Sequence, residues 1–152
     1  MSSTTRAIPV AIMALVGAAS CDSSVPAPEV IEIAVTGHDF KWKCRYAGPD
    51  GTLETDDDVP VGAALHVPTN TLVRIHLTSD DFIYTLMCPK LASKEVAVPG
   101  IVFRIEFDSG AAGAFELRGD QMCGYTHESL FGELVVESPE SWRQWMAGVT
   151  KR

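Results

Sequence analysis

The stretch GDQMCGYTHESL, residues 119–130, joins two strand-like segments at 114–117 and 131–136. Within this stretch Cys123 and His127 stand four residues apart on a loop. A thiolate and an imidazole that reach the same ion favour copper or zinc over calcium or magnesium. The sequence therefore predicts a β-sheet protein with a candidate metal site in the loop between two of its strands.

The rest of the chain is marked by short segments in which apolar and polar residues alternate. The segments 31–35, 72–78 and 101–107 show this period of two, and the segment 40–46 shows it most sharply. In that segment one face carries Phe40, Trp42, Cys44 and Tyr46, and the other carries Lys41, Lys43 and Arg45. Roughly eight short strands with turns every 8–12 residues predict an all-β sandwich or barrel of Greek-key type.

A short helix is predicted at the C-terminus, because Ser138, Pro139 and Glu140 form a helix start signal. Its apolar residues Trp142, Trp145 and Met146 are spaced to cover one face.

The N-terminus has the pattern of an export signal. Arg6 precedes the apolar run 7–16, which is too short for a membrane span of roughly 20 residues, and small residues follow up to Cys21. This pattern predicts a signal peptide at 1–20 of the bacterial lipoprotein type, with Cys21 as the lipidated residue. Simple cleavage and an uncleaved anchor are the alternatives. The proline-containing segment 21–29 is predicted to be a tether, followed by one domain at 30–152.

The composition excludes some functions. The net charge is −8, which argues against nucleic acid as a partner. An acidic surface is compatible with a basic partner such as a small cytochrome, and also with simple solvation. Motifs for phosphate, dinucleotide or zinc-protease chemistry are absent, and a nucleophilic role for Cys123 lacks a neighbouring oxyanion site. No independent catalytic site is predicted.

The cysteine count leaves the thiol chemistry open. With Cys21 lipidated, three cysteines remain, which means one disulfide and a free thiol or three free thiols. The simplest arrangement is a Cys44–Cys88 disulfide with Cys123 free for a metal, although reduced buried cysteines are also common.

Several segments in order resemble the periplasmic domain of cytochrome c oxidase subunit II. In the family's copper loop, C-x-E-x-C-G-x-x-H-x-x-M, the matching residues are Cys123, Gly124 and His127. The segment 37–42 resembles the family's G-H-Q-W-Y-W strand, and further matches lie at 65–68, 77–81, 97–100 and 138–140. Their order implies a cupredoxin sandwich over residues 31–146 and, by family, a copper-binding component of respiratory electron transfer on the periplasmic face of a bacterial membrane.

The same resemblance implies that most copper ligands are missing. The family's first cysteine, its glutamate, its methionine, its first copper histidine and the tryptophan that admits electrons correspond to Gly119, Gln121, Leu130, Tyr84 and Phe40. The binuclear copper A centre needs two bridging thiolates, whereas this loop supplies only Cys123. The sequence therefore predicts at most a mononuclear copper site. The copper-free subunit II of the quinol oxidases is a precedent within the family.

Three functions of different classes follow. The first is an accessory domain of a haem-copper oxidase that has kept the scaffold and lost the metal. The second is a copper carrier or sensor with Cys123 and His127 as ligands, completed by Met122, the Gln121 backbone carbonyl, Tyr84 or Cys88. The third is a lipid-anchored interaction module without a metal. The remaining histidines, His38, His66 and His76, are expected to be ordinary surface or packing residues.

Overall fold

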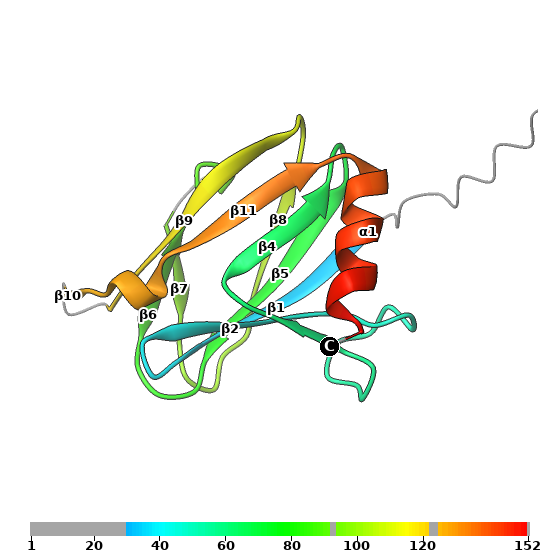
Figure 1. The fold of residues 1–152 in the computed structure, drawn as a ribbon. Helices are drawn as coiled ribbons and strands as arrows, with labels where there is room; N and C mark the ends of the chain where they lie inside the picture. Colours follow the sequence, from blue (N-terminus) through cyan, green and yellow to red (C-terminus); the bar gives the residue numbers. More distant parts are fainter. Residues whose placement is uncertain (1–29, 92–93, 122–124, 152) are drawn as a thin grey trace, which may run out of the picture.

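The computed structural model describes residues 30–91, 94–121 and 125–151. Two β-sheets pack face to face (Figure 1). The first sheet contains, in spatial order, β3 (Val59–Val61), β2 (Lys41–Tyr46), β1 (Val30–His38), β5 (Leu72–Ser79) and β8 (Phe103–Asp108). The second contains β4 (Ala64–Pro68), β11 (Gly132–Glu137), β9 (Gly113–Gln121), β6 (Tyr84–Met87) and β7 (Glu95–Ala97), with β10 (Tyr125–Thr126) paired to β9.

Most strand pairs are antiparallel, but each sheet also contains one parallel pair. β1 lies parallel to β5, with Val30 opposite Leu72, and β4 lies parallel to β11, with Leu65 opposite Leu134. These pairs join segments that are far apart in the sequence, as in a Greek-key arrangement. The predicted fold, an all-β two-sheet sandwich with a short C-terminal helix, is confirmed.

The core lies between the sheets and follows the predicted alternation. The inner residues of the first sheet are buried, among them Ile33, Val73, Ile75 and Leu77. They meet Leu65, Leu117 and Leu134 of the second sheet in one apolar cluster. A period of two is what a strand needs to put every second side chain into such a core.

Helix α1 (Pro139–Val149) begins where the capping signal predicts. The Ser138 hydroxyl accepts a hydrogen bond from the Ser141 N–H at 3.2 Å, and Pro139 occupies the first turn. The helix is anchored through Trp142, whose Nε1–H donates to the His66 carbonyl at 3.0 Å. The Tyr46 hydroxyl donates to the same carbonyl at 2.8 Å, so one backbone oxygen joins α1, β2 and β4.

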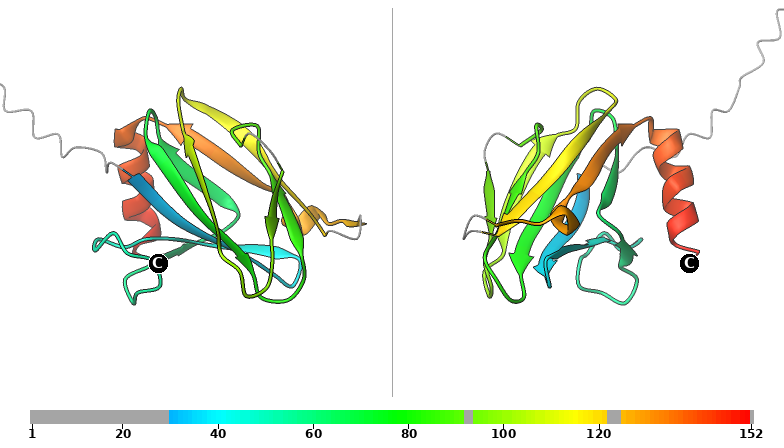
Figure 2. Two further views of the ribbon diagram at one scale, coloured as in Figure 1. Left: turned by 180° about the vertical axis from the view of Figure 1, so that it is seen from behind. Right: turned by 60° about the vertical axis from the view of Figure 1, so that its left-hand side comes forward.

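The helix and the candidate metal loop lie at opposite ends of the sandwich. Figure 2 shows this separation from two further directions, with α1 at one end and the 3₁₀ helix η1 (Glu128–Leu130) at the other. The end that carries η1 also carries the β1–β2 turn.

Two expectations need correction. Both Cys44 and Cys88 are free thiols, so the predicted disulfide is not formed. Cys44 lies on β2 of the first sheet, and Cys88 follows β6 of the second sheet. The segment 101–107 does form a strand over most of its length, but its apolar residues are only partly covered, because β8 is the edge of its sheet. Ile101 is 49% exposed and Phe103 is 38% exposed.

The predictions for the N-terminus, namely the signal peptide at 1–20, the lipidated Cys21 and the tether at 21–29, lie outside the described residues. Within the described part of the chain, no helix is long and apolar enough to cross a membrane.

Candidate functional site

The site at the η1 end is built around the two-residue turn between β1 and β2. His38 pairs with Lys41 across this turn, and the two central residues Asp39 and Phe40 have φ of 48° and 57°. Such left-handed pairs match the twist of a hairpin, but the conformation is unusual for an aromatic residue. It persists only where the surroundings hold it in place.

Three hydrogen bonds hold this turn. The Asp39 N–H donates to Asp81 Oδ2 at 2.7 Å, and the Phe40 N–H donates to the Tyr84 hydroxyl at 3.3 Å. From η1, the Ser129 hydroxyl donates to the Phe40 carbonyl at 2.6 Å. The turn is thereby fixed from both sides, and the Phe40 ring takes a defined position.

The Phe40 ring is the centre of a cluster of aromatic rings. Its centroid lies 4.2 Å from that of His127 and 5.4 Å from that of Phe82. Phe40 also meets Tyr84 edge to face at 6.2 Å, and Tyr84 meets Trp42 at 5.9 Å. The cluster runs from Phe82, which is 45% exposed, to Trp42 in the core. Of the predicted metal ligands, His127 belongs to this cluster through its ring contact with Phe40.

Tyr84, which the resemblance aligns with the family's first copper histidine, is fully buried. Its hydroxyl donates to Asp81 Oδ1 at 2.8 Å and accepts from Phe40 N–H. Burial raises the pKa of Tyr84 to about 12, and the hydrogen bond to Asp81 adds to this rise. The neutral hydroxyl is thus occupied within the protein. Gly37 makes room for the ring, because a Cβ there would lie 2.3 Å from Tyr84 Cδ2.

The carboxylate of Asp81 holds the β1–β2 turn and Tyr84 together. It accepts hydrogen bonds from the Asp39 N–H, the Tyr84 hydroxyl and the Phe82 N–H. The small burial of Asp81 opposes its charged form, but these three hydrogen bonds outweigh it and lower the pKa of Asp81 below its ordinary value.

This lowered pKa predicts a pH-dependent contribution to stability. Because the folded-state pKa lies below the unfolded value of about 3.9, the stabilisation is complete above that value and is lost as pH falls through the folded pKa. Asp81→Asn should therefore destabilise the chain at neutral pH, by about 1 kcal/mol because the carboxylate is exposed to water. The difference from wild type should shrink below about pH 4.

Urea unfolding of the full chain from neutral pH to about pH 3 measures this difference. Asp80→Asn is the matched control, since Asp80 is a neighbouring exposed carboxylate with looser contacts to His38 at 3.3 Å and Lys43 at 3.9 Å. A difference between wild type and Asp81→Asn that stays constant across the range would contradict the assigned role.

Trp42, at the core end of the aromatic cluster, fills the space beside Gly119. The Trp42 Nε1–H donates to the Leu130 carbonyl at 2.9 Å, and Leu130 itself is fully buried. A Cβ placed on Gly119 would lie 2.8 Å from Trp42 Nε1 and 2.8 Å from Leu130 Cβ. Distances below 3.0 Å between such atoms are not tolerated without a shift of the neighbours. Position 119 therefore has no room for a side chain in this packing.

The remaining predicted ligands are not all brought together. Cys123 and Met122 lie outside the described residues, and Gln121 is described by its backbone, which pairs with Tyr84. Cys88 lies four residues beyond Tyr84, roughly 13 Å along an extended strand. Strand β6 carries Cys88 away from the loop, because Met87 already pairs with Arg118.

The two described thiols are poor ligands where they stand. Burial raises the pKa of Cys44 to about 12, and burial also raises the pKa of Cys88. Metal binding and disulfide exchange use the thiolate, so both residues act as small buried apolar groups.

The other histidines have structural partners. His38 contacts Asp80, His76 Nε2 lies 2.7 Å from Glu32 Oε2, and His66 Nδ1 lies 2.8 Å from Glu137 Oε1. The ring of His66 also stacks on Trp145 at 4.3 Å. Among the residues that the structure describes, no three histidine, cysteine or acidic side chains converge as a metal site.

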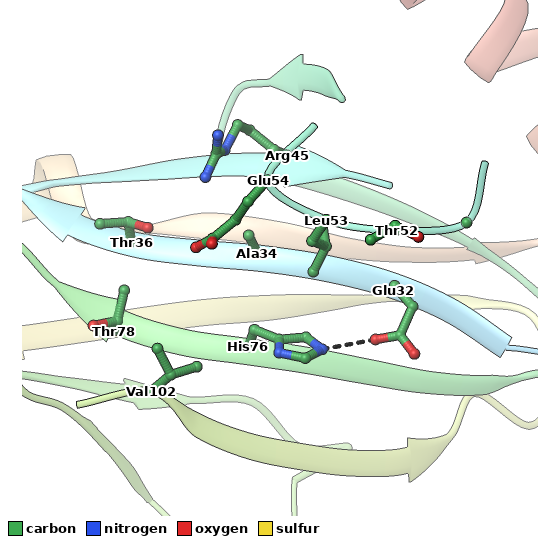
Figure 3. A pocket seen from close by; sticks show the side chains of 11 residues that line it. Glu32, Ala34, Thr36, Arg45, Thr52, Leu53, Glu54, His76, Thr78 and Val102 are labelled. Atoms are coloured by element: carbon green, nitrogen blue, oxygen red, sulfur yellow. Dashed lines mark hydrogen bonds and ion pairs between the residues drawn. The ribbon is translucent and has the colours of Figure 1, made fainter. Parts of the chain in front are cut away.

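A separate hollow of about 420 Å³ lies on the outer face of the first sheet. Figure 3 shows its floor, where Glu32 of β1 and His76 of β5 are joined by a hydrogen bond, and Glu54 and Arg45 lie above them. Glu32 also pairs with Arg74. Since its charged groups are largely satisfied within the protein, this hollow is a weaker candidate than the η1 end.

Sequence reasoning identified His127 and Tyr84 but missed Trp42, Asp81 and Gly37 as parts of the site. A partial signal for Asp81 was present in the sequence, because aspartate in a turn often accepts a hydrogen bond from a nearby backbone N–H, as Asp81 does from Phe82. The role of Trp42 had no such signal, since it depends on the spacing between the two sheets.

A two-sheet sandwich with its candidate site in a loop at one end is a cupredoxin-type domain. The chain belongs to the family of the periplasmic domain of cytochrome c oxidase subunit II, whose model matches residues 48–138. Among its relatives are the alternative cytochrome c oxidase subunit 2 of Bradyrhizobium diazoefficiens, 26% identical over 145 residues, and the cytochrome c oxidase subunit 2 of Alkalihalophilus pseudofirmus, 27% identical over 129 residues. The matches cover 81% and 82% of this chain but only 52% and 35% of those relatives. The chain thus spans about half of their length or less.

Solved structures agree on the fold. The periplasmic domain of cytochrome oxidase subunit II from Bradyrhizobium japonicum superposes with a TM-score of 0.65 at 21% identity, covering 83% of this chain and 98% of that domain. A second structure, a mixed disulfide intermediate between a thioredoxin-like protein and subunit II of cytochrome c oxidase, gives a TM-score of 0.63 at 23% identity and covers 80% of this chain and 92% of that one.

Proposed function

We propose that this chain is a subunit II-type domain associated with a respiratory haem-copper oxidase, in which packed side chains occupy the position of the binuclear copper centre. It acts as an accessory domain on the periplasmic side, and it holds at most one copper ion, at Cys123 and His127. The proposal rests on family membership for the respiratory setting and on the geometry at Gly119 for the missing centre.

The single observation that carries the proposal is the space beside Gly119. By resemblance, this position is that of the first bridging cysteine, and here Trp42 Nε1 and Leu130 Cβ would lie 2.8 Å from any Cβ. Leu130 stands at the methionine position and Tyr84 at that of the first histidine, and both are fully buried. The residues present therefore do not fit a copper pair that needs two bridging sulfurs.

Copper uptake by the full chain tests this proposal. We expect no more than one copper ion per chain after reduction of the thiols and titration with copper, and no purple absorption. Whatever copper binds should be lost in Cys123→Ser and in His127→Ala, because a thiolate and an imidazole are the soft ligands of this loop. His76→Ala is the matched control, since His76 is bonded to Glu32 on the outer face and its loss should leave copper uptake unchanged.

Two copper ions per chain with an electron spin shared between them would overturn the proposal. Complete absence of uptake would leave the accessory role in place and remove the copper carrier or sensor as an alternative.

The domain is proposed to be attached to the membrane through a lipid on Cys21. Small residues directly before this cysteine and the proline-containing tether at 21–29 support the attachment. Labelled fatty acid should enter the wild-type chain and not the Cys21→Ser chain; equal labelling of both would exclude this anchor.

A further inference from the structure

Strand β8 forms an open edge of the first sheet. In the described part of the chain, β8 pairs with β5 on one side and with no strand on the other. Every second residue of such a strand directs its N–H and C=O groups away from its neighbour, so an open edge is a template for another strand. Exposed apolar side chains gather where β8 begins, since Ile101, Val102 and Phe103 are 49%, 59% and 38% exposed.

Charges of opposite sign alternate across the outer face of this sheet and end at that edge. Glu32 of β1 lies opposite Arg74 of β5, and Arg74 lies opposite Glu106 of β8. The Arg74 guanidinium pairs with Glu32 and, through Nε, with Glu106 Oε1 at 2.6 Å. This row of alternating charges ends at the Glu106 carboxylate on the edge strand. A cation on a further strand, placed beside β8, would continue the alternation.

Arg104 is such a cation, on the same face of the same strand. It lies opposite His76, and among the described residues it has no acidic partner. Figure 3 shows the neighbouring part of this face, with Glu32 and His76 on adjacent strands and Val102 leading into β8. Arg104 and Glu106 thus form a base and an acid two residues apart at one open edge.

We propose that two copies of this chain associate edge to edge through β8, antiparallel, about a two-fold axis at Ile105. In this register Arg104 of each copy lies opposite Glu106 of the other, and Phe103 lies opposite Phe107. Both contacts occur twice, as an isologous interface requires. Directly opposite residues of antiparallel strands share a face, so the charges meet on the outer face and the aromatic rings on the inner face.

The charges select this register over its neighbours. A shift of the axis by one residue toward Arg104 places Arg104 opposite itself, and the opposite shift places Glu106 opposite itself. Like charges directly opposite each other are unfavourable, whereas a shift that changed the faces would turn the apolar side chains to water. Because β8 has only six residues, the interface is small and the dimer is weak, with a dissociation constant of roughly micromolar to millimolar.

A pair of charge reversals tests the proposal with the full chain. Sedimentation velocity over a concentration series should give a monomer–dimer equilibrium for wild type. Arg104→Glu places two acids opposite each other at both contacts, and Glu106→Lys places two bases there, so each variant alone should dimerise at least about tenfold more weakly. An equimolar mixture of the two variants should recover the dimer, because each heterodimer contact again joins an acid and a base.

The controls separate this result from loss of fold. Both side chains are exposed, so the variants should keep the circular dichroism spectrum of wild type. Glu116→Lys changes the same charge on β9 of the other sheet, where Glu116 pairs with Arg118 at 2.9 Å, and should dimerise like wild type. A wild-type chain that remains monomeric at every concentration, or a mixture that associates no better than the separate variants, would overturn the proposal.

Discussion

Gly119→Cys, which by resemblance places a cysteine at the position of the family's first bridging cysteine, is expected to lower the free energy of unfolding by about 1–3 kcal/mol, as extra atoms forced into a packed core do. The new Cβ would lie 2.8 Å from both Trp42 Nε1 and Leu130 Cβ. These two neighbours come from β2 and from the end of η1, and the hydrogen bond between the Trp42 indole and the Leu130 carbonyl ties them together. The variant should therefore lose stability without gaining a binuclear copper centre.

Urea unfolding of the full chain measures the loss, and Gly62→Cys is the control. Gly62 has open space around the position of a Cβ, so the same substitution there should change stability little. The Trp42→Phe background adds a second test: the smaller ring removes part of the obstruction, and the cost of Gly119→Cys should fall, a non-additivity expected of residues in contact. Equal costs in both backgrounds would show that Trp42 does not block position 119.

Trp42→Ala is expected to have the largest effect, a loss of about 3–5 kcal/mol. The substitution removes the buried ring from its contact with Tyr84 at 5.9 Å and leaves the Leu130 carbonyl without its donor at 2.9 Å. Since small domains are stable by only about 5–15 kcal/mol, the variant should be largely unfolded at moderate denaturant concentrations.

Trp42→Phe and Trp145→Ala define the reference for this result. Trp42→Phe keeps an aromatic ring and should cost less than Trp42→Ala. Trp145 lies on α1, half-buried, with its ring stacked on His66, and its replacement by alanine should also cost less. If Trp145→Ala proved as harmful as Trp42→Ala, the central position assigned to Trp42 would be wrong.

The strands could be predicted from the sequence because their signals are local. Alternation alone identifies the inner faces of β2 and β5, and the Ser138–Pro139 signal identifies the first turn of α1. These features depend on side chains within a few residues of one another. The sandwich follows from many such strands separated by turns, and the structure confirms it.

The sequence alone indicates where the candidate site lies, but it does not predict how the side chains around that site pack. Gly119 can be read there as an absent ligand, yet its meaning depends on Trp42, which is 77 positions earlier in the chain and belongs to the other sheet. The Cys44–Cys88 pairing was wrong for a similar reason, since the sequence does not give the separation in space of two cysteines that are 44 positions apart. The exposure of Ile101 and Phe103 depends on β8 being the last strand of its sheet, and alternation carries no information on strand order.

The parallel pairing of β4 with β11 has a consequence for the order in which the molecule can form. During synthesis β4 appears more than sixty residues before β11, its only partner strand in the described part of the chain. The second sheet therefore cannot close until the ribosome has released residues 132–137. Until then the apolar face of β4 needs shielding, and contacts between such distant segments make folding slow.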